Sequence, residues 1–222
     1  GITSIRYGGH QSINWPNIEY RGETDPEEFF GWQYTEGLFK DTYDAGIEMS
    51  VIIEPKENPA ATTERLQEFY DLVYTAVEKF DGDGIDDANG SPVVAYWEVD
   101  NEPDISAEWE EFFVWQGRPE LIDDYALTVQ TAYKAIKAAN PNAKVAIGAL
   151  GTNVTYFELV FEELEKLKDS PNDRFFDVFN FHVYGDYREY GRYTYPYEGA
   201  PPRMTMPIIN KLLEDYGYSG IE

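Results

Sequence analysis

Polar side chains follow several apolar runs of this chain, and their types suit proton transfer to an oxygen leaving group. Glu102 comes just after an apolar run at 93–99. A carboxyl group can give a proton and take it back, while amide, guanidinium, imidazole and phenol groups hold a polar substrate in place. The candidate set is Arg6, Asn101, Glu102, His182 and Tyr184. In parallel α/β folds reactive residues lie where strands end, so we expect these side chains to share one rim.

Short β-branched runs alternate along the chain with longer segments whose apolar residues recur every three or four positions. The first pattern indicates buried strands and the second indicates amphipathic helices. The predicted strands are 2–7, 49–53, 93–99, 145–150 and 176–183. The predicted helices run from Asp25 towards Tyr43 and through 66–77, 125–136, 157–167 and 209–213. This alternation predicts an α/β fold with a parallel sheet.

Two arrangements of such a sheet remain open from the pattern alone. The strands are almost continuously apolar, as expected for strands buried on both faces, and this suits both an open doubly wound sheet and a closed barrel. No G-x-G-x-x-G motif or phosphate-binding loop follows any predicted strand. Nucleotide binding is therefore disfavoured, although a flavodoxin-like sheet is still compatible with the sequence.

The stretch 96–104 reads YWEVDNEPD and resembles the fourth-strand motif of clan A glycoside hydrolases. These retaining barrel enzymes include cellulases, mannanases and β-xylosidases. The resemblance implies that Glu102 is the general acid/base and that Asn101 bonds the sugar 2-hydroxyl. It also implies substrate-site roles for Arg6, by its place at the end of the second barrel strand, and for His182 and Tyr184 of FNFHVYG. Each of the last three has a structural alternative, as an ion-pair partner, a core histidine or a packing aromatic.

The resemblance implies a partial (β/α)₈ TIM barrel that covers roughly strands 2 to 6 and the start of strand 7. The catalytic nucleophile of the clan is a Glu at the end of the seventh strand, and Glu222 would lie only near the start of that strand. We therefore expect residues 1–222 to form a single catalytic barrel domain truncated at both ends, since such barrels typically need about 250 residues. The nucleophile is expected beyond the C-terminus, and the isolated chain is expected to be inactive and prone to associate.

The implied function is hydrolysis of O-glycosidic bonds in β-linked oligo- or polysaccharides by double displacement. One alternative is a non-catalytic carbohydrate-binding barrel that keeps the polar rim. Another is an unrelated α/β enzyme in which Asn-Glu-Pro is a coincidence, with Glu102 away from Arg6 and His182. The sequence does not identify the sugar, the linkage, or internal against terminal cleavage.

Composition limits the partners. The formal net charge is −25, which argues against nucleic acid and anionic membrane surfaces. There are no cysteines, so disulfides and thiolate metal sites are excluded. We expect a carbohydrate substrate, no cofactor, no catalytic metal and, from the family alone, a secreted or extracellular protein.

Two loops have a distinctive composition. Residues 81–87 read DGDGIDD, which resembles a calcium loop but lacks the full EF-hand spacing. We expect an exposed acidic turn with at most weak calcium binding. The aromatic segment from Tyr184 to Tyr197 is expected to border the substrate cleft, with a mobile surface loop as the alternative. Glu54, at the end of the second predicted strand, is expected to be structural.

Overall fold

The structure is a computed structural model that describes residues 1–15, 32–55, 57–105, 114–115, 117–151, 153–182 and 202–221. Its centre is a parallel sheet in the order β1-β3-β4-β5-β6, with the short β2 also pairing with β3. The strands are β1 (Ser4–Tyr7), β2 (Ile13–Asn14), β3 (Glu48–Glu54), β4 (Tyr96–Asn101), β5 (Lys144–Leu150) and β6 (Val178–Phe181). Apart from the short β2, each strand lies beside the next one along the chain, which is the order of a barrel and not of a doubly wound sheet.

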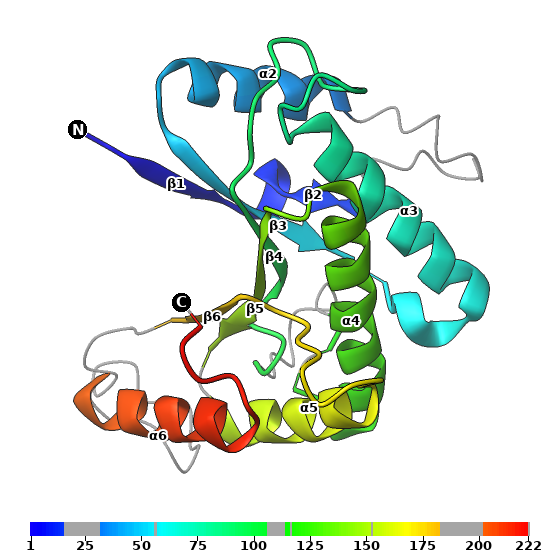
Figure 1. Cartoon of the computed structure of the whole chain (residues 1–222), viewed down its shortest axis with the longest axis vertical. Helices are drawn as coiled ribbons and strands as arrows, with labels where there is room; N and C mark the ends of the chain where they lie inside the picture. The colour runs from blue at the N-terminus through cyan, green and yellow to red at the C-terminus, as the bar shows by residue number, and fades with distance from the viewer. Residues whose placement is uncertain are drawn as a thin grey trace.

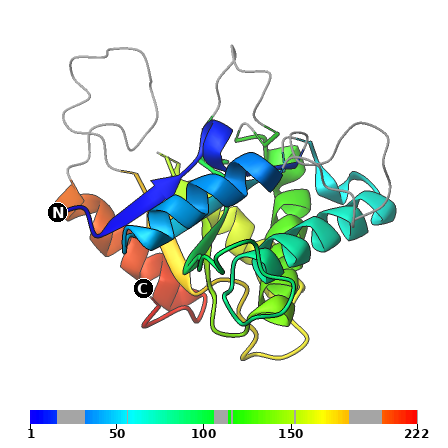
Figure 2. The ribbon, with the colours of Figure 1, turned by 90° about the horizontal axis from the view of Figure 1, so that it is seen from above.

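Helices cover one side of this curved sheet. Figure 1 shows α2, α3, α4, α5 and α6 following one another around the sheet in chain order, and Figure 2 shows the same layer from above. Their bounds are α2 (Trp32–Asp44), α3 (Thr63–Lys79), α4 (Ile122–Ala139), α5 (Val154–Lys166) and α6 (Pro202–Asp215). The expected partial (β/α)₈ barrel is therefore confirmed. No helix in the described ranges is long and apolar enough to cross a membrane.

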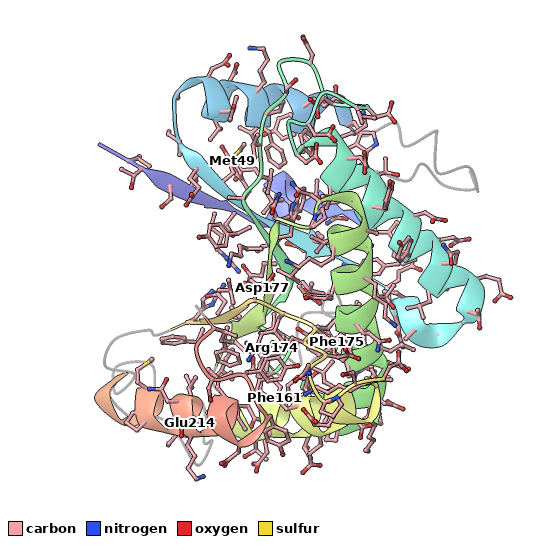
Figure 3. The ribbon with its side chains drawn as sticks, in the orientation of Figure 1. Met49, Phe161, Arg174, Phe175, Asp177 and Glu214 are labelled. Atoms are coloured by element: carbon pink, nitrogen blue, oxygen red, sulfur yellow. The ribbon has the colours of Figure 1, made fainter. Side chains whose placement is uncertain are left out.

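The core lies between the sheet and the helices. Trp97 and Val99 of β4 are fully buried there. Phe161 of α5, labelled in Figure 3, packs on Phe176 with ring centroids 5.5 Å apart, and Phe176 stacks on Tyr218 at 4.1 Å. Burying each such aromatic side chain contributes about 1.5–3 kcal/mol. This packing fixes the strands and hence the positions of the side chains at their ends.

A glycine allows close contact between β4, β5 and α4. A Cβ atom at Gly148 would lie 2.6 Å from the Val99 carbonyl oxygen and 2.7 Å from Tyr125 Oη. Tyr125 Oη instead donates a hydrogen bond to that carbonyl at 3.1 Å. A side chain at position 148 would push α4 away from the strand that carries the candidate site.

The start of β4 differs from the sequence expectation. Residues 93–95 were predicted as strand, but β4 begins at Tyr96. The Val94 N–H donates to the Phe80 carbonyl, so this segment still follows the end of α3 before it joins the sheet. The predicted helix start at Asp25 lies outside the described residues.

Candidate active site

The carboxyl ends of the parallel strands bring three of the predicted side chains to one rim. Asn101 is the last residue of β4 and Glu102 the next, while His182 directly follows β6. The His182 N–H also donates to the Leu150 carbonyl at the end of β5, at 2.8 Å. Glu102 and His182 therefore lie on the same rim, at the ends of β4 and β6, which are separated only by β5, and this excludes the arrangement in which Glu102 points away from the rim.

Glu102 and His182 are in direct contact. His182 Nδ1 lies 2.5 Å from Glu102 Oε1, and their side chains are only 21% and 14% exposed, respectively. A contact this short in a partly dehydrated place is a charge-assisted hydrogen bond when either group is ionised. The sequence predicted His182 as a substrate ligand, and the structure places its Nδ1 on the candidate acid.

Arg6 lies between two side chains of β4. Its Nε donates to Glu98 Oε2 at 2.7 Å and its Nη2 to Glu98 Oε1 at 2.8 Å. Nη2 also donates to Asn101 Oδ1 at 2.7 Å. Arg6 thus reaches the predicted Asn101, and it is also the ion-pair partner that the sequence left as an alternative.

Sequence reasoning missed Glu98. Its side chain is fully buried and also accepts a hydrogen bond from the Ala149 N–H at 3.0 Å. The sequence feature that could have identified it is a single charged residue inside the apolar run VVAYWEV. A carboxylate buried in such a run needs a hydrogen-bonding or charged partner. The sequence does not indicate which residue is that partner, since Arg6 is 92 residues away from Glu98.

The backbone around Glu102 adopts a conformation that side chains disfavour. Asp100 has φ 67° and Glu102 has φ 49°, both in the left-handed region without being glycine. Such residues each cost on the order of 1–3 kcal/mol and cluster at functional sites. The Asp100 carboxylate compensates locally, because its Oδ1 accepts the Asn101 N–H at 2.6 Å.

Asp104 ties the Glu102 loop to the loop after β5. Its Oδ1 accepts the Gly151 N–H at 2.8 Å and its Oδ2 accepts the Asn153 N–H at 2.6 Å. Asp104 is 2% exposed, so these bonds are made away from water. Asn153 in turn caps α5 by accepting the Tyr156 N–H. The acid is therefore positioned by two loops that share one carboxylate.

Buried phenols lie beneath this rim. Burial raises the pKa of Tyr125 well above its ordinary value, and the nearby Asp100 carboxylate raises it further. Burial likewise raises the pKa of Tyr156, with added effects of Asp100 and Asp104. Both phenols therefore stay neutral at any working pH and add no charge to the site.

The remaining predicted residues contribute less. Glu54 is 5% exposed and its Oε1 accepts the Gly9 N–H at 2.8 Å, which fits the expected structural role. Tyr184 and the aromatic segment up to Tyr197 lie outside the described residues.

The acidic loop after α3 uses its carboxylates on its own backbone. Ligand oxygens of Asp81, Asp83 and Asp87 lie within 4.8 Å of one another. Asp87 accepts the N–H groups of Gly82 and Gly84, Asp81 accepts that of Asp83, and Asp83 accepts that of Ile85. The arrangement suits the expected acidic turn and lies away from the rim.

A family comparison covers most of the chain. The family model for cellulase, glycosyl hydrolase family 5, matches residues 41–213. No curated protein matches the chain by sequence. The matched range runs from the end of α2 into α6 and so contains Glu98, Asn101, Glu102 and His182.

Solved structures share the fold. A glucosidase from Croceicoccus marinus superposes with a TM-score of 0.69 at 16% identity, over 99% of this chain and 44% of its own. A family 51 α-L-arabinofuranosidase from Bifidobacterium longum gives 0.55 at 16%, over 97% and 44%. An α-L-arabinofuranosidase from Thermotoga maritima gives 0.55 at 15%, over 98% and 43%. The chain thus spans less than half the length of each of these proteins.

Proposed function

Because the chain belongs to the cellulase family, glycosyl hydrolase family 5, we propose that it carries the acid/base half of a retaining glycoside hydrolase. The substrates are β-linked oligo- or polysaccharides. The observation that carries this proposal is the position of Glu102 on the strand rim, with its carboxylate against His182 and its neighbour Asn101 bonded to Arg6. A coincidental Asn-Glu-Pro would have no reason to bring these four side chains together.

In the proposed first step Glu102 protonates the glycosidic oxygen while a second carboxylate attacks the anomeric carbon. The leaving sugar departs with that proton, and a covalent glycosyl-enzyme remains. The two carboxyl groups of a retaining enzyme lie about 5–5.5 Å apart. We place the nucleophile at the end of a seventh strand beyond residue 222.

In the second step the Glu102 carboxylate takes a proton from a water molecule, whose oxygen attacks the anomeric carbon. The bond to the enzyme carboxylate breaks, and the sugar leaves with its original configuration. His182 Nδ1 holds Glu102 Oε1 and so restrains the carboxyl group that exchanges the proton. Asn101 donates to the sugar 2-hydroxyl, a contact that strengthens in the oxocarbenium-like transition state. Tyr184 is proposed to contact the substrate.

Leaving-group dependence tests the acid role. In the complete gene product, Glu102→Gln should lower kcat/KM by roughly 10²–10⁴-fold on an aryl glycoside with a poor leaving group. The loss should be much smaller on a dinitrophenyl glycoside, which departs without protonation. Glu48→Gln is the control, because Glu48 is an exposed carboxylate at the opposite end of β3.

The outcomes separate the candidate functions. Equal losses on both substrates would contradict the acid role. A complete gene product that binds an oligosaccharide but hydrolyses none of the glycosides would support the non-catalytic carbohydrate-binding alternative.

A further inference from the structure

Glu98 joins three strands beneath the rim. From β4 it accepts two hydrogen bonds from Arg6 of β1, at 2.7 and 2.8 Å, and one from the Ala149 N–H of β5, at 3.0 Å. Its side chain is 0% exposed, whereas that of Arg6 is 35% exposed. Glu98 is thus held by hydrogen bonds from β1 and β5, and it in turn fixes Arg6, which extends towards solvent.

We propose that Glu98 is a positioning residue, which sets the orientation of the Asn101 amide through Arg6. The proposal rests on the function proposed above and assigns the Glu98–Arg6–Asn101 chain to recognition of the sugar 2-hydroxyl. Glu98 itself lies below the rim and acts only through the guanidinium.

The chemistry of the three groups determines which way the amide faces. A guanidinium has only donors, so the atom of Asn101 that meets Arg6 Nη2 at 2.7 Å is the carbonyl oxygen Oδ1. The NH₂ group of Asn101 is then the end that can donate to a substrate. Donation to the sugar O2 leaves the hydroxyl hydrogen free to be donated to a carboxylate such as the proposed nucleophile. An amide rotated by 180° would present an acceptor to the same hydroxyl.

Arg6 needs Glu98 to hold the amide this way. Arginine is a long side chain with many rotamers, and a single hydrogen bond to a neutral amide oxygen does not hold it. The bidentate pair with Glu98 fixes the plane of the guanidinium and so aims Nη2 at Asn101. The Ala149 N–H fixes Glu98 Oε1, the oxygen that receives Nη2.

A matched control exists at the opposite end of β5. Asp177, labelled in Figure 3, pairs with Lys137 at 2.8 Å and accepts the Val145 N–H at 2.9 Å. It therefore bonds one cation and one β5 backbone N–H, as Glu98 does. Because it precedes β6 and meets the start of β5, it is remote from the rim.

The test uses two substrates that differ by one hydroxyl. In the complete gene product, Glu98→Gln and Asn101→Ala should each lower kcat by about 100-fold on the preferred aryl glycoside, with a much smaller change in KM. Most of this loss should disappear on the 2-deoxy analogue of that glycoside. Asp177→Asn should reduce the melting temperature and leave kcat unchanged on both substrates.

Two further measurements keep the test decisive. If Glu98→Gln does not fold, Arg6→Met combined with Glu98→Leu removes the pair without leaving a buried lone charge, and it should show the same dependence on the 2-hydroxyl. The side-chain ¹⁵N–¹H signals of Asn101, identified by their loss in Asn101→Ala, should shift in the Glu98 variant and not in Asp177→Asn.

The results distinguish this proposal from the function on which it rests. Equal losses on the two substrates, or unchanged Asn101 signals, would show that Glu98 is merely structural, even where Glu102→Gln confirms the glycosidase. If no glycoside is hydrolysed, the proposed function fails, while the Asn101 signals still decide whether Glu98 orients the amide.

Discussion

At the scale of single residues, the candidate acid is defined by its surroundings more than by its motif. Glu102 has a left-handed backbone conformation and a histidine nitrogen 2.5 Å from one carboxylate oxygen. Together these restrain both the backbone and the side chain. A loop carboxylate with only a structural role has no need of such restraint.

The contact with His182 should appear in the rate of catalysis. His182 Nδ1 restrains one oxygen of Glu102, so His182→Ala should lower kcat/KM more on an aryl glycoside with a poor leaving group than on a dinitrophenyl glycoside. His182→Asn is the control, because the Asn amide keeps a hydrogen-bonding group near the position of Nδ1 and should retain most of the wild-type rate. An unchanged rate in His182→Ala would contradict this role.

Sequence alone located these residues but not their partners. Arg6, Asn101, Glu102 and His182 could be selected because each lies at or just after the end of an apolar run. The Glu98–Arg6 pair and the Glu102–His182 contact span 92 and 80 residues, so they depend on strand order and register. Tyr184 stays a prediction.

At the scale of elements, the loop after β4 is held by the loop after β5. The two hydrogen bonds of Asp104 to Gly151 and Asn153 fix the segment that carries Glu102. Helix periodicity predicted the surrounding elements well, and α4, from Ile122 to Ala139, contains the predicted segment 125–136. These two hydrogen bonds of Asp104 were not predictable, because nothing in the sequence indicates which backbone N–H groups an aspartate after Asn-Glu-Pro will bind.

Removing the Asp104 carboxylate should lower both the free energy of unfolding and kcat. Asp104→Ala should lower the free energy of unfolding by about 2–3 kcal/mol, since hydrogen bonds to a charged acceptor are lost in a buried place. It should also lower kcat, because the strained Glu102 backbone is no longer held. Asp173 is the matched control, as its Oδ2 accepts the N–H groups of Asp169 and Ser170 in a remote loop.

Urea unfolding and steady-state kinetics of both variants make this comparison. Asp173→Ala should change stability alone. A kcat that falls equally in Asp104→Ala and Asp173→Ala would show that loop stability, and not the position of Glu102, controls the rate.

The acidic loop after α3 should make stability depend on pH. Burial raises the pKa of Asp81, the backbone N–H of Asp83 partly opposes this, and repulsion by Asp83 adds to it. A raised folded-state pKa favours the protonated form, so this contribution is complete below the ordinary value of 3.8 and is lost as pH rises through the folded value. Asp81→Asn should therefore raise the melting temperature at pH 7 in EDTA and lose that advantage near pH 3.

A calcium titration distinguishes an acidic turn from a calcium-binding loop at residues 81–87. We expect at most weak binding, so millimolar calcium should produce little heat and little change in melting temperature in the wild type. A large calcium-dependent stabilisation that Asp81→Asn removes would contradict the acidic-turn interpretation.

At the scale of the whole molecule, the described strands form an open parallel sheet with β1 and β6 at its two edges. Open edges offer unpaired backbone groups to other chains. The net charge of −25 opposes that association through repulsion. The fold class followed from strand–helix alternation and the motif, whereas the curvature of the sheet follows from packing that no local pattern encodes.

The isolated 222-residue chain should therefore associate in a salt-dependent manner. Salt at 1 M reduces the screening length to about 3 Å, so light scattering should give a larger mass in high salt than in low salt. The same preparation should show no turnover of an aryl glycoside. A monomer at both salt concentrations, or turnover that Glu102→Gln abolishes, would contradict this prediction.

The most direct test of the central claim is azide rescue of a Glu102 variant. Glu102→Ala in the complete gene product should hydrolyse a dinitrophenyl β-glycoside slowly, because water attacks the glycosyl-enzyme without a base. Azide needs no base, so it should restore turnover and yield a β-glycosyl azide that NMR identifies by its retained configuration. Absence of rescue, or an azide product of inverted configuration, would show that Glu102 is not the acid/base of a retaining glycosidase.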